Sequence, residues 1–378
     1  MHAVPPGVRG GWIHCDPEGE PAGSGLRNPF GTDSPGCNRI VINLSYLPGA
    51  IENYFRDGTR WGCQIAYSYE GRIVDGKFVG SALGSAGGLK KVQDFSNFFD
   101  DTFLVVCGDA LIDLDVGKLR EFHRSRGAVA TIALKEVPLS EVYRYGVVAV
   151  DETGRILRFQ EKPRPEEAVS TTVNTGIYMF DPAVFEFIPS GVEYDIGGQL
   201  LPALVQAGAP FYGISPPFRW VDIGSIPDYW AATRLVMSGK IRGISLPGRE
   251  IAPGIYTGIN LRLNPEKVNL TPPVYIGSST FIGDGATIVG PTVIGANCII
   301  EGGAILKQCV IDDHVKIADI ADISEKIIFS GNYIDPKGQY LDLAEADMEW
   351  VITDARKEIN ISETHLLLKE LAHGAGPG

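Results

Sequence analysis

Two aspartates and one lysine carry the chemistry that this sequence suggests. Asp109 follows the apolar run Phe103 to Val106, and Asp222 follows Trp220-Val221. Each aspartate therefore stands where a buried strand is expected to end and meet solvent. Lys162 stands between a glutamate and a proline. Carboxylates hold Mg²⁺ and a lysine neutralises phosphate, so the set suits attack by a phosphate oxygen on the α-phosphorus of a nucleoside triphosphate, with loss of pyrophosphate.

Each of these residues alone has a simpler interpretation. An aspartate at a strand end is usually a turn or capping residue, and Glu161-Lys162-Pro163 by itself is usually a solvated turn. The order and spacing of the whole set favour the chemical interpretation.

The region from Arg39 to Gly239 resembles the sugar-nucleotide pyrophosphorylases, also called NDP-sugar nucleotidyltransferases. The resemblance rests on five segments in a fixed order, which are Leu83-Gly84-Ser85-Ala86-Gly87-Gly88, Tyr145-Gly146-Val147-Val148, Phe159-Gln160-Glu161-Lys162-Pro163, Asn174-Thr175-Gly176-Ile177-Tyr178 and Trp220-Val221-Asp222-Ile223-Gly224. It implies that Asp109 and Asp222 bind Mg²⁺ and that Lys162 contacts the phosphate of a sugar 1-phosphate.

The resemblance also implies where the substrates bind. The loop from Gly84 to Gly88 would hold the nucleobase, through Gly84, Ala86, Gly87 and Gly88, and Gly108 would join the substrate site. The sugar pocket would be lined by Gly146, Glu161, Asn174 and Thr175. A glycine-rich loop lets a flat base approach the backbone, and Asn and Glu supply donors and acceptors for hydroxyl groups. Taken singly, these residues also suit a flexible turn, a bulge or a turn residue.

The start of the chain departs from the family. The family opens with an apolar strand, a Gly-x-Gly-Thr-Arg phosphate loop and a later Pro-Lys-Pro, which grip the triphosphate. Neither motif is present: Gly23-Ser24-Gly25-Leu26-Arg27 lacks the Thr-Arg pair, and the first lysine is Lys77. Residues 1–38 are instead rich in Gly and Pro without periodicity, which indicates an irregular opening.

Two explanations compete for this opening. We expect that the start is not the natural one, through a wrong start site or a frameshift. The alternative is a protein that has lost its triphosphate grip and serves another purpose. Both predict impaired turnover, because a preorganised cationic grip on phosphate contributes orders of magnitude in rate.

Composition places the chain among soluble enzymes. Its 378 residues are 44% hydrophobic, enough for a core and about two domains. No window approaches a membrane span and no basic-then-apolar leader follows Met1, so we expect a cytoplasmic protein. The six cysteines form no CxxC pair, which favours reduced thiols. A net charge of −13 argues against nucleic acid as a partner.

Strand and helix signals alternate through the first part of the chain. We expect strands at Ile40 to Leu44, Gln64 to Tyr69, Thr102 to Val106, Val129 to Leu134 and Gly146 to Val150, with helices near Pro48 to Phe55, Ala86 to Phe95 and Asp115 to Arg126. This alternation predicts an α/β, Rossmann-like nucleotidyltransferase domain over residues 39–240, with a mixed, mostly parallel sheet and helices on both faces.

A second architecture follows a linker at residues 241–270. Apolar residues recur at every sixth position, at Ile276, Ile282, Ile288, Ile294, Ile300 and Leu306, and after a one-residue slip at Ile311, Ile317 and Ile323. This period predicts a left-handed parallel β-helix of hexapeptide repeats over residues 271–330, with short sandwich strands as the alternative. The remaining residues 331–378 are expected to form a tail that is helical from Ala344 to Leu371 and caps the coil or meets a partner.

The sequence leaves more than one interpretation open for the role of the coil and for the identity of the substrates. We expect the coil to form a homo-oligomer, with an acyltransferase using His314 as the other possibility. The chain looks most similar to bacterial mannose-1-phosphate guanylyltransferases, which implies GDP-mannose synthesis from mannose 1-phosphate and GTP. Glucose-1-phosphate enzymes that use UTP, dTTP or ATP share nearly all these residues, and a non-catalytic regulatory subunit that binds sugar nucleotide is a further alternative.

Overall fold

The fold is taken from a computed structural model, which describes residues 38–45, 47–329 and 331–357. The chain divides after Asp222 into two compact units. We refer to the first as the catalytic unit and to the second, which starts at Ile223, as the coil unit.

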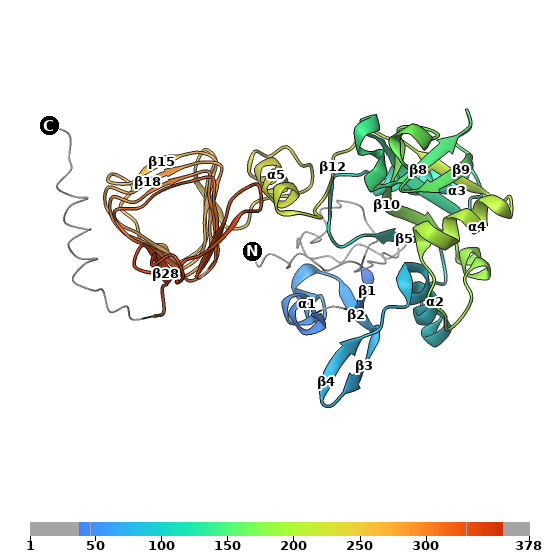
Figure 1. Ribbon diagram of the computed structural model, residues 1–378, viewed down its shortest axis with the longest axis horizontal. Helices are drawn as coiled ribbons and strands as arrows, with labels where there is room; N and C mark the ends of the chain where they lie inside the picture. The colour runs from blue at the N-terminus through green and yellow to red at the C-terminus, as the bar shows by residue number, and fades with distance from the viewer. Residues whose placement is uncertain (1–37, 46, 330, 358–378) are drawn as a thin grey trace. The chain divides into compact units, whose positions relative to one another are not determined.

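One mixed sheet organises the catalytic unit (Figure 1). Its six strands run in the order β11-β7-β10-β8-β9, with β5 also paired to β10. Their bounds are β5 (Phe103–Val106), β7 (Ala130–Glu136), β8 (Gly146–Val150), β9 (Ile156–Glu161), β10 (Thr172–Phe180) and β11 (Phe211–Ile214). The ladders of this sheet are mostly antiparallel, because β10 runs against β5, β7 and β8, and only β11 and β7 are parallel. The sheet is thus mixed as predicted, but the prediction of mostly parallel pairing is wrong for it.

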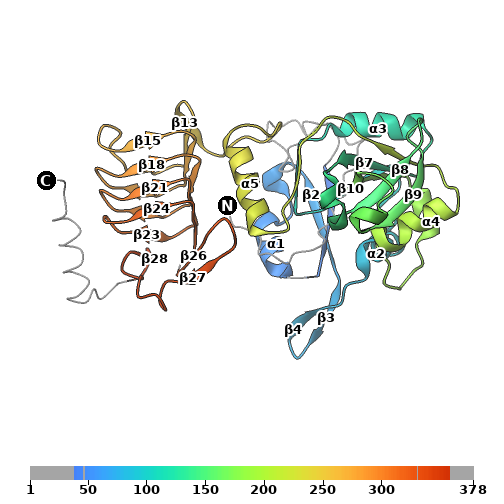
Figure 2. The same ribbon diagram turned by 45° about the horizontal axis from the view of Figure 1, so that its top comes forward.

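Among the described residues of this unit, three smaller ladders supply the other strands. They are the parallel pair β1 (Arg39–Leu44) and β2 (Gln64–Tyr69), the antiparallel pair β6 (Ala110–Ile112) and β12 (Trp220–Asp222), and the hairpin β3 (Gly71–Val74) and β4 (Lys77–Gly80). The β-branched run Ile40 to Ile42 is buried, which confirms the expected first strand. The hairpin projects from the rest of the unit (Figures 1 and 2).

Helices cover both faces of the mixed sheet, as predicted. They are α1 (Pro48–Phe55), α2 (Gly84–Ser96), α3 (Val116–Ser125) and α4 (Leu201–Gln206). Alternate residues of β5 point to opposite faces, because side chains alternate along a strand. Phe103 packs in the cluster that includes Leu89 of α2, and Leu104 packs in the cluster that includes Leu119 of α3.

The coil unit is a three-sided parallel β-helix, triangular in Figure 1 and seen as a stack of turns in Figure 2. One side holds β14 (Ile255–Thr257), β16 (Val274–Ile276), β19 (Thr292–Ile294), β22 (Val310–Ile311) and β25 (Ile327–Phe329). The second holds β15 (Asn269–Thr271), β18 (Thr287–Val289), β21 (Ile305–Lys307) and β24 (Asp322–Ser324), and the third β17 (Phe281–Ile282), β20 (Ile299–Ile300) and β23 (Val315–Ile317).

The strand register explains the six-residue period. Ile276 pairs with Ile294, and Ile294 pairs with Ile311, so one turn of the coil takes 18 residues and the next takes 17. Each turn has three sides, and the missing residue accounts for the slip seen in the sequence. The periodic residues from Ile276 to Ile317 are buried inside the coil, where they stack from turn to turn, and Ile323 is partly buried against them.

The two ends of the coil depart from the predicted boundaries. The coil begins inside the predicted linker, because β14 already pairs with β16, and β13 (Arg249–Ala252) runs antiparallel to β14. At the other end, β26 (Asn332–Ile334) and β27 (Tyr340–Asp342) extend one side, and β28 (Ile352–Asp354) pairs antiparallel with β23. The predicted helix from residue 344 is therefore wrong as far as residue 357, where turns and a buried strand occur. The rest of the predicted tail lies outside the described residues.

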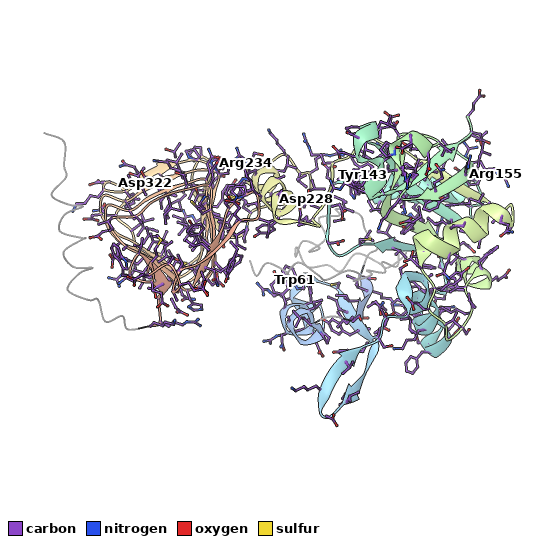
Figure 3. The ribbon with its side chains drawn as sticks, in the orientation of Figure 1. Trp61, Tyr143, Arg155, Asp228, Arg234 and Asp322 are labelled. Atoms are coloured by element: carbon purple, nitrogen blue, oxygen red, sulfur yellow. The ribbon has the colours of Figure 1, made fainter. Side chains whose placement is uncertain are left out.

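The helix α5 (Ile226–Met237) packs on one side of the coil. Ser225 caps it by accepting from the Asp228 N–H, and Trp230 and Met237 lie against Val293 and neighbouring residues of the coil. Arg234, which is labelled on this helix in Figure 3, donates from Nη1 to Gln308 Oε1 at 2.8 Å. Within the described part of the chain, no helix has the length and apolar character needed to span a membrane.

Candidate active site

The strand pair β6 and β12 brings the two predicted metal ligands to neighbouring backbone positions. The buried strand β5 ends at Val106, and Asp109 lies in the turn that leads into β6. Asp222 is the last residue of β12 and pairs with Ala110, the residue after Asp109. Both aspartates are half-buried. The predicted convergence of these two residues is therefore present in the catalytic unit.

The electrostatics of Cys107 show how negative this turn is. Burial, together with the nearby charges of Asp109, Asp222 and Asp195, raises the pKa of the Cys107 thiol to about 12. Three carboxylates from three segments thus act on one thiol. Such a field disfavours additional negative charge and attracts a cation.

The donor set at this turn fits Mg²⁺ better than a metal held by protein ligands alone. Among the residues that the structure describes, no three His, Cys, Asp or Glu side chains are grouped so as to hold a metal ion. Mg²⁺ is usually bound by one or two carboxylates together with waters and substrate phosphates. Asp109 and Asp222 would supply the two carboxylates.

Glu161 is the last residue of β9, and Lys162 follows it directly. Gly146 pairs with Glu161 in the register of β8 and β9, and the Lys162 N–H donates to Tyr145 O at 3.1 Å. Lys162 has a φ of 46°, a left-handed conformation that a non-glycine residue rarely adopts. Its Nζ lies 3.9 Å from Glu161 Oε1, and 56% of the lysine side chain is exposed. This loose pair leaves the ammonium group accessible to a phosphate.

Two glycines hold space beside the Glu161 carboxylate. A Cβ on Gly146 would stand 2.5 Å from Phe159 Cζ and 3.1 Å from Glu161 Oε2, and a Cβ on Gly197 would stand 3.0 Å from the same Oε2. Burial raises the pKa of Glu161; Asp195 also raises it, while Lys162 opposes the shift. The carboxylate is therefore partly desolvated, as a group that binds sugar hydroxyls would be.

Asn174 sits at an irregularity of β10, where the register with β7 shifts between Asn174 and Tyr178. Its Nδ2 donates to Tyr178 Oη at 2.8 Å, and its Oδ1 accepts from the Gly176 N–H at 2.9 Å. The amide is thus held in one orientation. Thr175 is buried, and its hydroxyl donates to Ala133 O at 2.7 Å. If Thr175 lines a sugar pocket as predicted, it would therefore do so through its backbone groups.

The predicted nucleobase loop is the first turn of α2. Gly84 has a φ of +73° and starts the helix, while Ala86, Gly87 and Gly88 are buried in it. A Cβ on Gly88 would stand 2.3 Å from Glu70 Oε1, so this glycine is required by packing. The prediction that this turn contacts a nucleobase is not tested by the structure. Such a contact would have to use the side of the turn that is not buried.

Sequence reasoning missed Asp195. Its carboxylate accepts from the Gly198 N–H at 2.7 Å, and so caps the π-helical turn η5 (Ile196–Leu200). An aspartate before Ile-Gly-Gly-Gln indicates such a cap, but nothing in that pattern indicates its nearness to Cys107 and Glu161. The other predicted residue, Gly108, is exposed in the turn before Asp109.

His314 lies at a corner of the coil and is half-buried. Its φ is 60°, its N–H donates to Ala296 O, and its carbonyl accepts from the Ala355 N–H. These backbone contacts give the residue a structural role and lend no support to an acyltransferase.

Comparison with known proteins identifies the family of the chain. The sequence matches the Nucleotidyl transferase family over residues 33–239 and the Bacterial transferase hexapeptide (six repeats) family over residues 273–308. The chain belongs to the nucleotidyl transferase family.

Individual relatives differ in the sugar and the nucleotide that their names give. A UTP–glucose-1-phosphate uridylyltransferase of Synechocystis sp. is 52% identical over 85% of this chain and 83% of its own length. A mannose-1-phosphate guanylyltransferase of Mycobacterium tuberculosis is 29% identical over 75% and 69%. A glucose-1-phosphate adenylyltransferase of Desulfitobacterium hafniense is 27% identical over 76% and 74%. The chain was expected to be most similar to mannose-1-phosphate guanylyltransferases. Its sequence identity to the uridylyltransferase is instead higher, at 52% against 29%.

Proposed function

We propose that this protein is a glucose-1-phosphate uridylyltransferase, which forms UDP-glucose and pyrophosphate from UTP and glucose 1-phosphate. The observation that carries the proposal is 52% identity to a UTP–glucose-1-phosphate uridylyltransferase over 83% of that relative. The guanylyltransferase and adenylyltransferase relatives stand at 29% and 27%. The proposal therefore replaces GDP-mannose synthesis, which the sequence motifs favoured.

The site residues fit the steps of this reaction. A phosphate oxygen of glucose 1-phosphate attacks the α-phosphorus of UTP, a new P–O bond forms, and the bond to pyrophosphate breaks. Mg²⁺, when bound by Asp109 and Asp222, would neutralise the phosphate oxygens at the reacting centre. Lys162 would neutralise the phosphate of the sugar, because its ammonium group is exposed beside Glu161.

The sugar itself would be read by the groups around Glu161. The Glu161 carboxylate accepts hydrogen bonds, and Asn174 has its amide fixed by Tyr178 and Gly176. Gly146 keeps this side of the pocket open, because a side chain there would meet Phe159 and Glu161. The first turn of α2 would face the base.

Slow turnover is part of the proposal. The sequence contains neither the Gly-x-Gly-Thr-Arg loop nor the Pro-Lys-Pro lysine of the family, so the triphosphate lacks its usual cationic grip. The product UDP-glucose needs no such grip for its sugar half. Binding of product is therefore a more sensitive test of identity than rate.

Calorimetric titration of the full chain in Mg²⁺ buffer tests this proposal. UDP-glucose, GDP-mannose and ADP-glucose are titrated separately at matched concentrations. We expect UDP-glucose to bind at least roughly tenfold more tightly than the other two, as discrimination of a hydrogen-bonded base allows. Tighter binding of GDP-mannose would overturn the assignment in favour of the mannose enzymes.

The missing phosphate loop also favours a second candidate, a regulatory subunit that binds sugar nucleotide without turnover. Such a protein co-purifies with a complete homologue in a pull-down experiment and changes its rate, whereas an enzyme does not need one. Homo-oligomerisation through the coil and a cytoplasmic location remain predictions. Gel filtration and cell fractionation test them.

A further inference from the structure

The first turn of α2 is joined to the segment before η5 by backbone hydrogen bonds. The Tyr194 N–H donates to Leu83 O at 2.8 Å, and the N–H groups of Ala86 and Gly87 both donate to Tyr194 O at 2.9 Å. The contact is close, because a Cβ on Gly84 would stand 2.6 Å from Tyr194 O. The turn predicted to face the base and the segment that carries Asp195 are therefore one connected structure.

Ser85 adds the side-chain part of this connection. Its Oγ donates to Asp195 Oδ2 at 2.6 Å and accepts from the Ile196 N–H at 2.6 Å. The other oxygen of Asp195 accepts from the Gly198 N–H at 2.7 Å. Both carboxylate oxygens of Asp195 are thus oriented, one by its own turn and one by α2.

The orientation of Asp195 matters because of what stands next to it. A Cβ on Gly197 would stand 3.0 Å from Glu161 Oε2 and 3.5 Å from Asp195 Oδ1, so Gly197 lies between the two carboxyl groups. Burial raises the pKa of Glu161, and the charge of Asp195 raises it as well. A rotation of Asp195 therefore changes the charge and the space available beside Glu161.

We propose that Ser85 is a positioning residue, which fixes Asp195 and the Ile196 amide and thereby sets the affinity for the sugar half of the substrate. The inference rests on the proposed function, since it assigns the surroundings of Glu161 to the sugar. Ser85 acts through Asp195 and need not contact the sugar itself.

Removal of the Ser85 hydroxyl has a defined consequence. In Ser85→Ala, Asp195 loses one hydrogen bond to its charged group, and the Ile196 N–H loses its partner. Loss of such a bond weakens binding through the affected group by roughly tenfold. The backbone hydrogen bonds between Tyr194 and α2 are unchanged, so the helix itself is retained. Ser85→Thr keeps the hydroxyl and restores the connection.

The experiment compares two ligands with four proteins. Wild type, Ser85→Ala, Ser85→Thr and the control Ser96→Ala are titrated calorimetrically with UDP-glucose and with UMP in Mg²⁺ buffer. Ser96 is on the same helix and its Oγ donates to Val92 O at 3.0 Å, so it controls for removal of a helical serine hydroxyl. We expect Ser85→Ala to lower the affinity for UDP-glucose by about tenfold and the affinity for UMP by less than about twofold. Ser85→Thr and Ser96→Ala should behave as wild type.

Three results would overturn the inference. Unchanged UDP-glucose affinity in Ser85→Ala shows that Ser85 does not position the sugar site. Equal weakening of UDP-glucose and UMP, with a lowered melting temperature, shows a general structural role instead. Failure of wild type itself to bind UDP-glucose removes the proposed function and this inference with it, whereas the first two results leave the proposed function intact.

Discussion

Asp222 at the end of β12 pairs with Ala110 in β6, so its backbone is adjacent to that of Asp109 although the two segments are far apart in the chain. The pairing gathers both carboxylates around Cys107, whose pKa they raise. The short ladder of β6 and β12 thereby brings together the two carboxylates that we propose as ligands of a hard cation. The consequences for Mg²⁺, for phosphate and for the sugar can be tested separately.

Asp109→Asn and Asp222→Asn should each remove the dependence of the protein on Mg²⁺. Each change keeps the shape of the side chain and removes one metal-binding charge. We expect turnover to fall by roughly a hundredfold or more, as on loss of an electrostatic group at a reacting phosphate. Calorimetry of UDP-glucose with and without Mg²⁺ gives a readout that does not need turnover. Asp100→Asn, at an exposed aspartate, is the control. Retention of the full Mg²⁺ effect in both variants would contradict the two-carboxylate site.

Lys162→Ala should weaken the binding of UDP-glucose more than that of UMP. The sugar phosphate of the product loses a charge-assisted hydrogen bond, which corresponds to roughly ten- to hundredfold in affinity. Lys118→Ala on α3, where 71% of the side chain is exposed, controls for loss of a surface lysine. Equal affinity for UDP-glucose in wild type and Lys162→Ala would show that this lysine does not contact the phosphate.

Gly197→Ala should impair the sugar pocket while its neighbour Gly198→Ala should not. The new Cβ at residue 197 would stand 3.0 Å from Glu161 Oε2, closer than ordinary packing allows, whereas at residue 198 the nearest atom is Asp195 Oδ1 at 3.5 Å. We expect UDP-glucose affinity to fall several-fold only in the first variant, by about the cost of a displaced hydrogen bond. The idea fails if the two variants bind alike.

The stability of the catalytic unit should depend on pH through His123. This histidine of α3 is buried, with Nδ1 2.9 Å from Thr131 Oγ1, and burial lowers its pKa from 6.5 to about 4. The unfolded chain therefore binds more protons below pH 6.5, so the contribution is present above that pH and is lost as the pH falls toward 4. Between pH 7 and pH 5 the loss is about 2 kcal/mol.

Urea unfolding at pH 7 and pH 5 measures this contribution. His123→Gln, which cannot titrate, should lose less stability between the two pH values than wild type. Thr131→Val removes the partner hydroxyl but keeps the titrating group, and should therefore retain the wild-type pH dependence. Identical pH dependence in wild type and His123→Gln would show that another group is responsible.

The coil was the part of the fold most open to prediction. A six-residue repeat such as Ile276, Ile282 and Ile288 predicts which residues face the interior, because each side of the coil takes six residues. The tail was predicted less well. Residues 352–354 form a strand because β23 offers an unpaired edge, and such long-range pairing leaves no periodic signal in the tail.

The catalytic unit shows a similar limit. Alternating strand and helix signals identified the elements, but the insertion of β10 between β5 and β7 makes the ladders antiparallel, and strand order is a long-range property. Among the candidate site residues, Asp109, Lys162 and Asp222 were predicted from motifs, and their roles stay predictions. Asp195 was missed, because its link to Ser85 joins segments that the sequence does not relate.

The measurement that tests the central claim most directly is pyrophosphate release by the purified full chain in Mg²⁺ buffer, with glucose 1-phosphate or mannose 1-phosphate and each of UTP, GTP, dTTP and ATP. We predict slow release that is fastest with glucose 1-phosphate and UTP. Faster release with mannose 1-phosphate and GTP would contradict the proposed substrates. No release from any pair, by a folded protein that binds UDP-glucose, would contradict catalysis and leave the regulatory subunit.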